Sequence, residues 1–99
     1  MTRRNLHRND FATALKKVRN SRGLSQLDFS LASSRTHVSA LERGIKKPAL
    51  DTVEELAEVL DIHPLSLLAL AYLKKSSFEE AEILLTRVKA ELSEANVLK

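Results

Sequence analysis

A short segment, residues 35–43, concentrates side chains that can bind phosphate groups and the polar edges of other molecules. If this segment forms a helix, Val38 and Leu41 share one face, because positions three apart are neighbours on a helix. The opposite face then presents cationic, hydroxyl and small side chains, at Arg35, Thr36, Ser39, Ala40 and Arg43. Guanidinium and hydroxyl groups in this pattern favour hydrogen-bonded recognition of an anionic polymer.

The sequence offers no cluster of side chains that is typical of an enzyme. Its three histidines, His7, His37 and His63, lie far apart, and none begins a His-Glu-x-x-His metal motif. There are no cysteines for thiolate chemistry or cysteine-based zinc sites. Two glycines, Gly23 and Gly44, provide neither a Gly-rich phosphate loop nor a Gly-x-Ser-x-Gly motif. We therefore expect no enzyme activity, no metal and no cofactor.

The charge is divided unevenly along the chain. The net charge of the 99 residues is +3, yet residues 1–50 carry +8 and residues 51–99 carry −5. A strongly basic half is typical of a surface that meets an anionic partner, and nucleic acid is the first candidate. The acidic half is expected to face away from that partner.

The composition indicates one small, soluble domain built of helices. Hydrophobic residues make up 43% and charged residues 29% of the chain, which argues against disorder. Gly and Pro number two each, which is too few for the turns of a β-rich fold. The longest apolar run, residues 65–73, is much shorter than the roughly 20 residues of a membrane-spanning helix. We expect an all-α protein in the cytoplasm, with no membrane contact.

Apolar spacing and capping residues predict six helices that would hold the polar segment in place. The expected ranges are 10–22, 25–32, 35–43, 51–60, 64–75 and from 77 onward. Gly23 and Gly44 are expected to end the first and third helices. Helix caps are expected at Asp10, at Ser33 or Ser34, and in three capping boxes, Ser25–Asp28, Asp51–Glu54 and Ser77–Glu80.

The last two predicted helices carry more apolar surface than a small domain is expected to cover. Residues 65–73 are apolar nearly all round. The final helix has a heptad seam with spacings of 3 and 4, at Phe78, Ala81, Leu85, Val88, Leu92 and Ala95. Two interpretations remain open, a helix that packs on its own domain and a helix that forms a dimer. We favour dimerisation through Leu68, Tyr72, Phe78, Ala81, Leu85, Val88 and Leu92.

Residues 18–48 resemble the Xre family, the Cro and phage-repressor type of helix-turn-helix DNA-binding domain. The matching residues are Arg19, Gly23, Leu24-Ser25-Gln26, Val38-Ser39, Leu41-Glu42-Arg43-Gly44 and Pro48. The stretch SRTHVSALERG is also similar to controller proteins of restriction–modification systems. The resemblance implies a five-helix repressor-type domain at residues 10–75. A flexible basic arm at 1–9 and an amphipathic dimerisation helix at 76–99 would flank it.

The resemblance also implies a role for each matching position. Residues 35–43 would enter the major groove of DNA. Base contacts would come from Arg35, Thr36, His37, Ser39 and Ala40. Phosphate contacts would come from Ser25, Gln26, Ser34, Arg43, Lys46 and Lys47. Arg19 and Glu42 would form a structural ion pair. The chain departs from the family in a shorter spacing between its two central helices, where Ser33-Ser34 replaces the usual turn glycine.

These features together predict a sequence-specific transcriptional regulator. We expect a repressor of bacterial, phage or plasmid origin that binds an inverted-repeat operator on double-stranded DNA as a homodimer, and that associates with the nucleoid when bound. The alternative is an antitoxin or another protein-interaction module that keeps the helix-turn-helix fold. In that case the acidic C-terminal helix would bind a protein partner.

Overall fold

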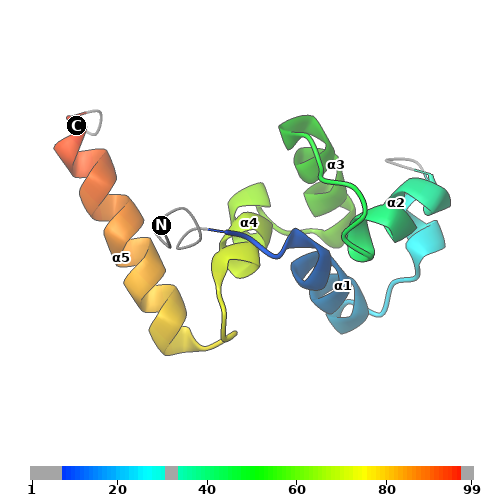
Figure 1. The fold of residues 1–99 in the computed structure, drawn as a ribbon, viewed down its shortest axis with the longest axis horizontal. Coiled ribbons are helices and arrows are strands. Elements are labelled where there is room, and N and C mark those ends of the chain that lie inside the picture. Colours follow the sequence, from blue (N-terminus) through cyan, green and yellow to red (C-terminus); the bar gives the residue numbers. More distant parts are fainter. Residues whose placement is uncertain (1–7, 31–33, 97–99) are drawn as a thin grey trace.

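The computed structural model describes residues 8–30 and 34–96, and within them the regular structure is entirely helical. The elements are α1 (Phe11–Ser21), the 3-10 helix η2 (Gln26–Phe29), α2 (Arg35–Glu42), α3 (Leu50–Leu60), α4 (Pro64–Tyr72) and α5 (Phe78–Glu94). The prediction of an all-α protein is confirmed. Figure 1 shows α1 to α4 grouped together, with α5 set apart at one end. The predicted basic arm lies almost wholly outside the described residues.

Three of the side-chain caps that begin the helices are those that the sequence predicted. Asp10, Ser34 and Ser77 each accept a hydrogen bond from the backbone N–H three residues later, at 3.2, 3.1 and 3.1 Å. Of the two serines that could cap α2, the structure uses Ser34, and Ser33 lies outside the described residues. Gly23 and Gly44 follow α1 and α2 with φ of +69° and +75°, a conformation that glycine adopts without strain.

The start of α3 differs from the prediction. The helix begins at Leu50 with Ala49 as its N-cap, and no side chain caps it. The expected capping box at Asp51 is therefore wrong. The backbone is extended at Ala49 and helical from Leu50, so that Asp51 lies inside the first turn. A carboxylate there still interacts favourably with the positive end of the helix dipole.

The second predicted helix is a short 3-10 helix instead of an α-helix. It covers Gln26–Phe29, and the predicted end at Ala32 lies outside the described residues. The Asp28 carboxylate accepts hydrogen bonds from the backbone N–H of Ser25 at 2.6 Å and from its hydroxyl at 3.2 Å. These contacts tie the N-cap Ser25 to Asp28, three residues later, and form the capping box that the sequence predicted.

Elsewhere the helix ends need smaller corrections. α4 ends at Tyr72 instead of continuing to residue 75, because Leu73 is extended. The Ser77 hydroxyl caps α5, but the Glu80 carboxylate does not complete the predicted box. It accepts hydrogen bonds from the backbone N–H groups of Lys74 and Lys75 at 3.1 and 2.6 Å. Glu80 therefore stabilises the segment that joins α4 to α5.

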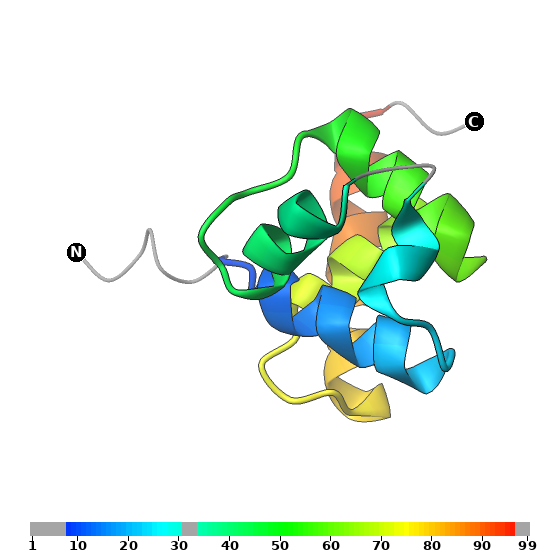
Figure 2. The same cartoon turned by 90° about the vertical axis from the view of Figure 1, so that its right-hand side faces the viewer.

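The core lies among α1 to α4 and η2. Phe29 anchors η2 and is 0% exposed, which explains why so short an element stays in place. In Figure 2, η2, α2 and α3 lie in front, while α5 lies behind them. The core side chains are Phe11, Ala14, Leu15, Phe29, Val38, Leu41, Val53, Leu56, Leu60, Leu67 and Ala71.

α5 leaves its heptad seam uncovered. The helix has no buried residue, and Phe78, Leu85, Val88 and Leu92 are 96%, 55%, 43% and 43% exposed. The side of α5 that faces α4 overlaps this seam at Val88 alone. A groove of about 520 Å³ separates the two helices there, lined by Tyr72, Leu73, Glu80, Ile83, Leu84, Arg87, Val88 and Glu91. Apart from Val88, the seam residues do not line this groove.

In residues 8–30 and 34–96, no helix combines the length and apolar character needed to cross a membrane. The same residues contain no group of three or more His, Asp or Glu side chains that could hold a metal ion.

Candidate nucleic-acid interface

The exposed face of α2 brings several predicted DNA-contacting residues to one place. Arg35 and Thr36 are exposed in the first turn, and Ser39 is half-buried one turn later. Arg43 is exposed at the C-cap, where its Nε donates a hydrogen bond to the Ser39 carbonyl at 3.3 Å. Together with Gln26 from η2, these four side chains line a shallow hollow of about 390 Å³. The hollow is polar, cationic and open to solvent.

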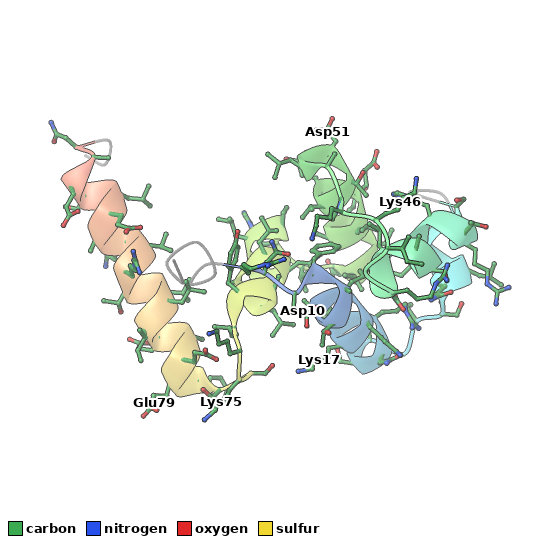
Figure 3. All side chains as sticks on the ribbon, in the orientation of Figure 1. Asp10, Lys17, Lys46, Asp51, Lys75 and Glu79 are labelled. Carbon is green, nitrogen blue, oxygen red and sulfur yellow. The ribbon has the colours of Figure 1, made fainter. Side chains whose placement is uncertain are left out.

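The remaining predicted contacts do not line this hollow. Ser34 is exposed at the start of α2, and His37 is half-buried in its first turn. Lys46 and Lys47 are exposed on the loop that joins α2 to α3, where Figure 3 labels Lys46. These two lysines line another hollow, shared with the start of α1. They therefore extend the basic surface and do not belong to the polar hollow itself.

Ala40 does not fit the role that the sequence suggested for it. Its side chain is 8% exposed, so its methyl group is not available to a thymine methyl in the groove. The chain after α2 folds back over this position, and the Ala40 carbonyl accepts hydrogen bonds from Ile45 and Lys46 N–H at 3.0 and 3.4 Å. The assignment of Ala40 as a base contact is therefore corrected.

Ser25 is also a poor candidate for a phosphate contact. Its backbone N–H and its hydroxyl both donate to the Asp28 carboxylate, at 2.6 and 3.2 Å. Both donors are occupied, and a negative charge stands beside them that would repel a phosphate. The Ser-x-x-Asp spacing had signalled this contact, although its consequence for DNA binding was missed.

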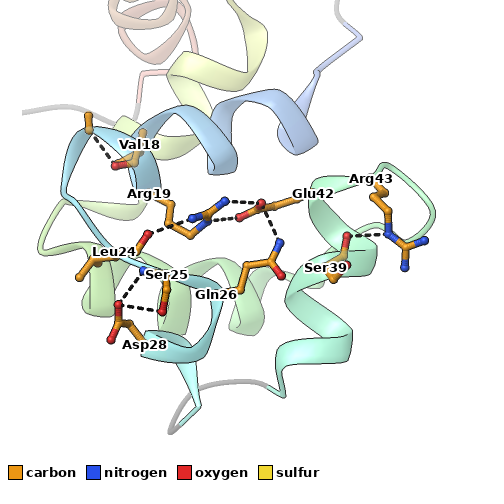
Figure 4. A network of polar contacts seen from close by, with 10 residues as sticks. Val18, Arg19, Leu24, Ser25, Gln26, Asp28, Ser39, Glu42 and Arg43 are labelled. Carbon is orange, nitrogen blue, oxygen red and sulfur yellow. Dashed lines mark hydrogen bonds and ion pairs between the residues drawn. The ribbon is translucent and has the colours of Figure 1, made fainter.

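An ion pair links α1 to the end of α2 behind the hollow. Arg19 donates from Nε and Nη2 to the two carboxylate oxygens of Glu42, at 2.6 and 2.9 Å. The Arg19 and Glu42 side chains are only 12% and 4% exposed, so the pair is largely removed from water. Arg19 Nη1 also donates to the Leu24 carbonyl at 2.9 Å, which fixes the turn after α1 (Figure 4).

Gln26 joins this network, a contact that the sequence analysis did not foresee. Its Nε2 donates to Glu42 at 3.1 Å, and the amide has a second hydrogen that remains for another acceptor. The side chain therefore connects the buried ion pair to the open hollow (Figure 4). No local sequence pattern indicates a contact between residues so far apart in the chain.

The network changes the ionisation of both charged partners. Burial alone would raise the pKa of Glu42, but hydrogen bonds from Arg19 and Gln26 and the charges of Arg19 and Lys16 outweigh it. The pKa of Glu42 therefore lies below its ordinary value of 4.5. The hydrogen bond to Glu42 raises the pKa of Arg19, against the opposing effect of burial. Both groups stay charged in the folded protein near neutral pH.

We expect acid to remove the stabilisation that Glu42 provides. Because the folded-state pKa is lowered, this contribution is complete above the ordinary value of 4.5 and is lost as the pH falls through the folded-state pKa. Urea unfolding of the wild type and of Glu42→Gln between pH 7 and pH 2.5 should therefore show a stability difference that shrinks below about pH 4.5. Glu91→Gln is the control, since Glu91 is 57% exposed. A Glu42→Gln difference that did not change with pH would contradict the assignment.

Comparison with known proteins identifies the domain that carries this surface. A family model described as helix-turn-helix matches residues 15–67, more than half of the chain. The chain belongs to the helix-turn-helix family. It is of the Cro and phage-repressor type, as the sequence resemblance indicated. No curated protein and no solved structure matches it.

The family assignment identifies the elements that form the hollow. Within a helix-turn-helix domain, η2 and α2 are the pair of helices on either side of the turn, and α2 is the second of them. The matched residues extend from α1 into α4 and do not include α5. This helix-turn-helix protein is therefore a DNA-binding regulator.

Proposed function

We propose that this helix-turn-helix protein is a sequence-specific repressor that binds an inverted-repeat operator as a homodimer. The observation that carries the proposal is the polar, cationic hollow on the exposed face of α2. An α-helix fits the major groove of DNA, where each base pair presents a distinct pattern of donors and acceptors. In helix-turn-helix proteins the first residues of the second helix contact base edges.

The reading of bases is assigned to the start of α2. Arg35 and Thr36 are both exposed there, and a guanidinium group can bind O6 and N7 of guanine with two hydrogen bonds. His37 and Ser39 are half-buried and would contact bases or sugars at the side of this pair. Ala40 is left out of the proposed set because it is buried.

Phosphate contacts are assigned to the rim of the same surface. Gln26 retains one amide hydrogen, Ser34 is exposed at the helix start, and Arg43 is exposed at the helix end. Lys46 and Lys47 lie beyond Arg43 on the loop and would bind the adjacent backbone. Such contacts orient the protein and supply affinity without reading sequence. Ser25 is not included, because Asp28 occupies its donors.

The proposed dimer uses the apolar surface that a single chain leaves exposed. Tyr72 on α4 and Phe78, Leu85, Val88 and Leu92 on α5 are all more than 40% exposed. Ala81 is half-buried beside them, whereas Leu68 packs against its own core and is left out. Two copies related by a two-fold axis would place their α2 helices in successive major grooves, about 34–36 Å apart. Repression is the simplest consequence of occupying DNA, because it needs no contact with another protein.

The salt dependence of binding tests the proposal. If each subunit neutralises about four phosphates, the logarithm of the dimer's affinity should fall with the logarithm of salt concentration at a slope near −7. Fluorescence anisotropy with an enriched operator duplex, measured between 50 and 300 mM KCl, provides the slope. A slope shallower than about −2 would show that few phosphates are contacted and would contradict the proposed docking.

The exposed seam of α5 also supports a second candidate, an antitoxin or interaction module that covers this face with another protein. The two candidates differ in what the purified protein does alone. A repressor selects an inverted repeat from random DNA, whereas an interaction module folds and yields no enriched sequence.

A further inference from the structure

The charged residues beside the α5 seam distinguish a parallel from an antiparallel pair of α5 helices. In heptad terms Phe78, Leu85 and Leu92 occupy a positions, and Ala81 and Val88 occupy d positions. The e positions are then Glu82 and Lys89, of opposite charge and one heptad apart. Both side chains are exposed, and within the described ranges neither takes part in an ion pair.

A parallel pair would leave these two charges unused. In that arrangement each g residue lies near the e residue five positions later in the partner. The resulting neighbours would be Ser77 with Glu82, Leu84 with Lys89, and Glu91 with Asn96, and none of these is a pair of opposite charges. Leu84 and Glu91 line the groove between α5 and α4, which Val88 borders from the seam, so the g side faces its own domain.

An antiparallel pair uses both charges. Aligning a layers with d layers places Leu85 beside Val88 of the other copy, and Ala81 beside Leu92. The e positions of the two helices then lie next to each other. Glu82 of each copy therefore lies close to Lys89 of the other copy, which gives two such pairs related by the two-fold axis. Opposite charges across a helix pair set partner orientation.

We propose that α5 pairs with α5 of a second copy in antiparallel orientation, with Leu85 and Val88 at the centre and Glu82 facing Lys89. This inference rests on the proposed homodimer and adds its orientation and register. The two-fold axis of this dimer is perpendicular to the two α5 helices, so the g positions of both helices lie on the same face of the helix pair. Because the g positions face the DNA-binding domain of their own chain, both DNA-binding domains lie on that face. That placement is compatible with two α2 helices meeting one face of a duplex.

Charge reversal in the full chain tests the orientation. Glu82→Lys and Lys89→Glu should each weaken dimerisation about tenfold, because each change converts two attractive exposed pairs into repulsive ones. The double variant should recover wild-type affinity, and an equimolar mixture of the two single variants should form heterodimers. Glu94→Lys, on the opposite face of α5, is the control and should leave dimerisation unchanged. Sedimentation equilibrium measures the dissociation constants, and circular dichroism confirms that each variant keeps its helices.

Disulfide cross-linking provides an independent readout, since the chain contains no cysteine. The double variant Ala81→Cys, Leu92→Cys should cross-link between copies, because these positions share a layer. Ala81→Cys alone should not, since its two copies would lie about 16 Å apart along the helix axis. If Ala81→Cys alone formed a cross-link, the antiparallel pair would be wrong, although the homodimer could still exist in another arrangement. The same conclusion would follow if neither charge reversal changed the dissociation constant of the dimer. A wild-type chain that stays monomeric would overturn both.

Discussion

Replacing Arg35 and Thr36 by alanine should abolish the preference of the protein for its operator. Each subunit would lose a two-hydrogen-bond contact to guanine, worth about 1–3 kcal/mol of discrimination. A dimer would lose about 2–6 kcal/mol, which corresponds to about 30-fold to about 20,000-fold in operator affinity. Both side chains are exposed, so their removal creates no cavity and should leave the fold unchanged. Selection from random oligonucleotides, followed by anisotropy with the enriched duplex, measures the loss.

The control for this experiment is Lys75→Ala, which removes a positive charge far from α2. Lys75 is exposed beside the start of α5 (Figure 3). Its loss should change operator affinity by less than about threefold, since its charge is largely screened at that distance. If the double variant enriched the same inverted repeat with wild-type affinity, α2 would not be the reading helix. If a folded, dimeric wild type enriched no sequence, the interaction-module candidate would replace the repressor.

Removing the Glu42 carboxylate should cost more stability than any exposed charge in the chain. Glu42→Ala would leave the guanidinium of Arg19, only 12% exposed, without its partner. Breaking a buried pair from one side costs about 3–5 kcal/mol, a large part of the roughly 5–15 kcal/mol that stabilises a typical domain. Gln26 would lose its acceptor as well. Urea unfolding at pH 7, followed by circular dichroism, measures this cost.

Two variants sharpen this test. Glu91→Ala breaks the Arg87–Glu91 pair on α5, which is 58% and 57% exposed, and should change stability by at most about 0.5 kcal/mol. Arg19→Met combined with Glu42→Leu removes both charges and should recover part of the stability, since no unpaired charge remains. If Glu42→Ala cost no more than Glu91→Ala, the buried pair would have no structural role.

The sequence predicted those parts of the fold that depend on local interactions. Caps at Asp10, Ser34 and Ser77 could be foreseen because each contact joins residues three apart. A short helix was predicted at residues 25–32, but its 3-10 type was not, since a single turn is decided by its packing and not by helix propensity. The start of α3 at Leu50 was missed, because the Asp51–Glu54 spacing fits a capping box that the structure does not form.

The site was predicted less completely than the fold. Exposure of Arg35 and Thr36 followed from the helical period, because the apolar positions Val38 and Leu41 fix the buried face. The burial of Ala40 did not follow, since the polar face of α2 had been taken to include it. The contact between Gln26 and Glu42 joins residues that are far apart in the chain, so no local spacing of residue types predicts it. It became visible in the structure.

The Arg19–Glu42–Gln26 network also bears on the entropy of DNA recognition. It joins α1, η2 and α2, so the angle of α2 is already set when the protein folds (Figure 4). Orienting these helices therefore costs no further conformational entropy when DNA binds. The affinity for DNA is not reduced by such a cost. A loosened network would make the side chains of α2 approach the bases at variable angles. Discrimination between sequences would then suffer more than attraction to the phosphates, because directional hydrogen bonds depend on angle and long-range charge does not.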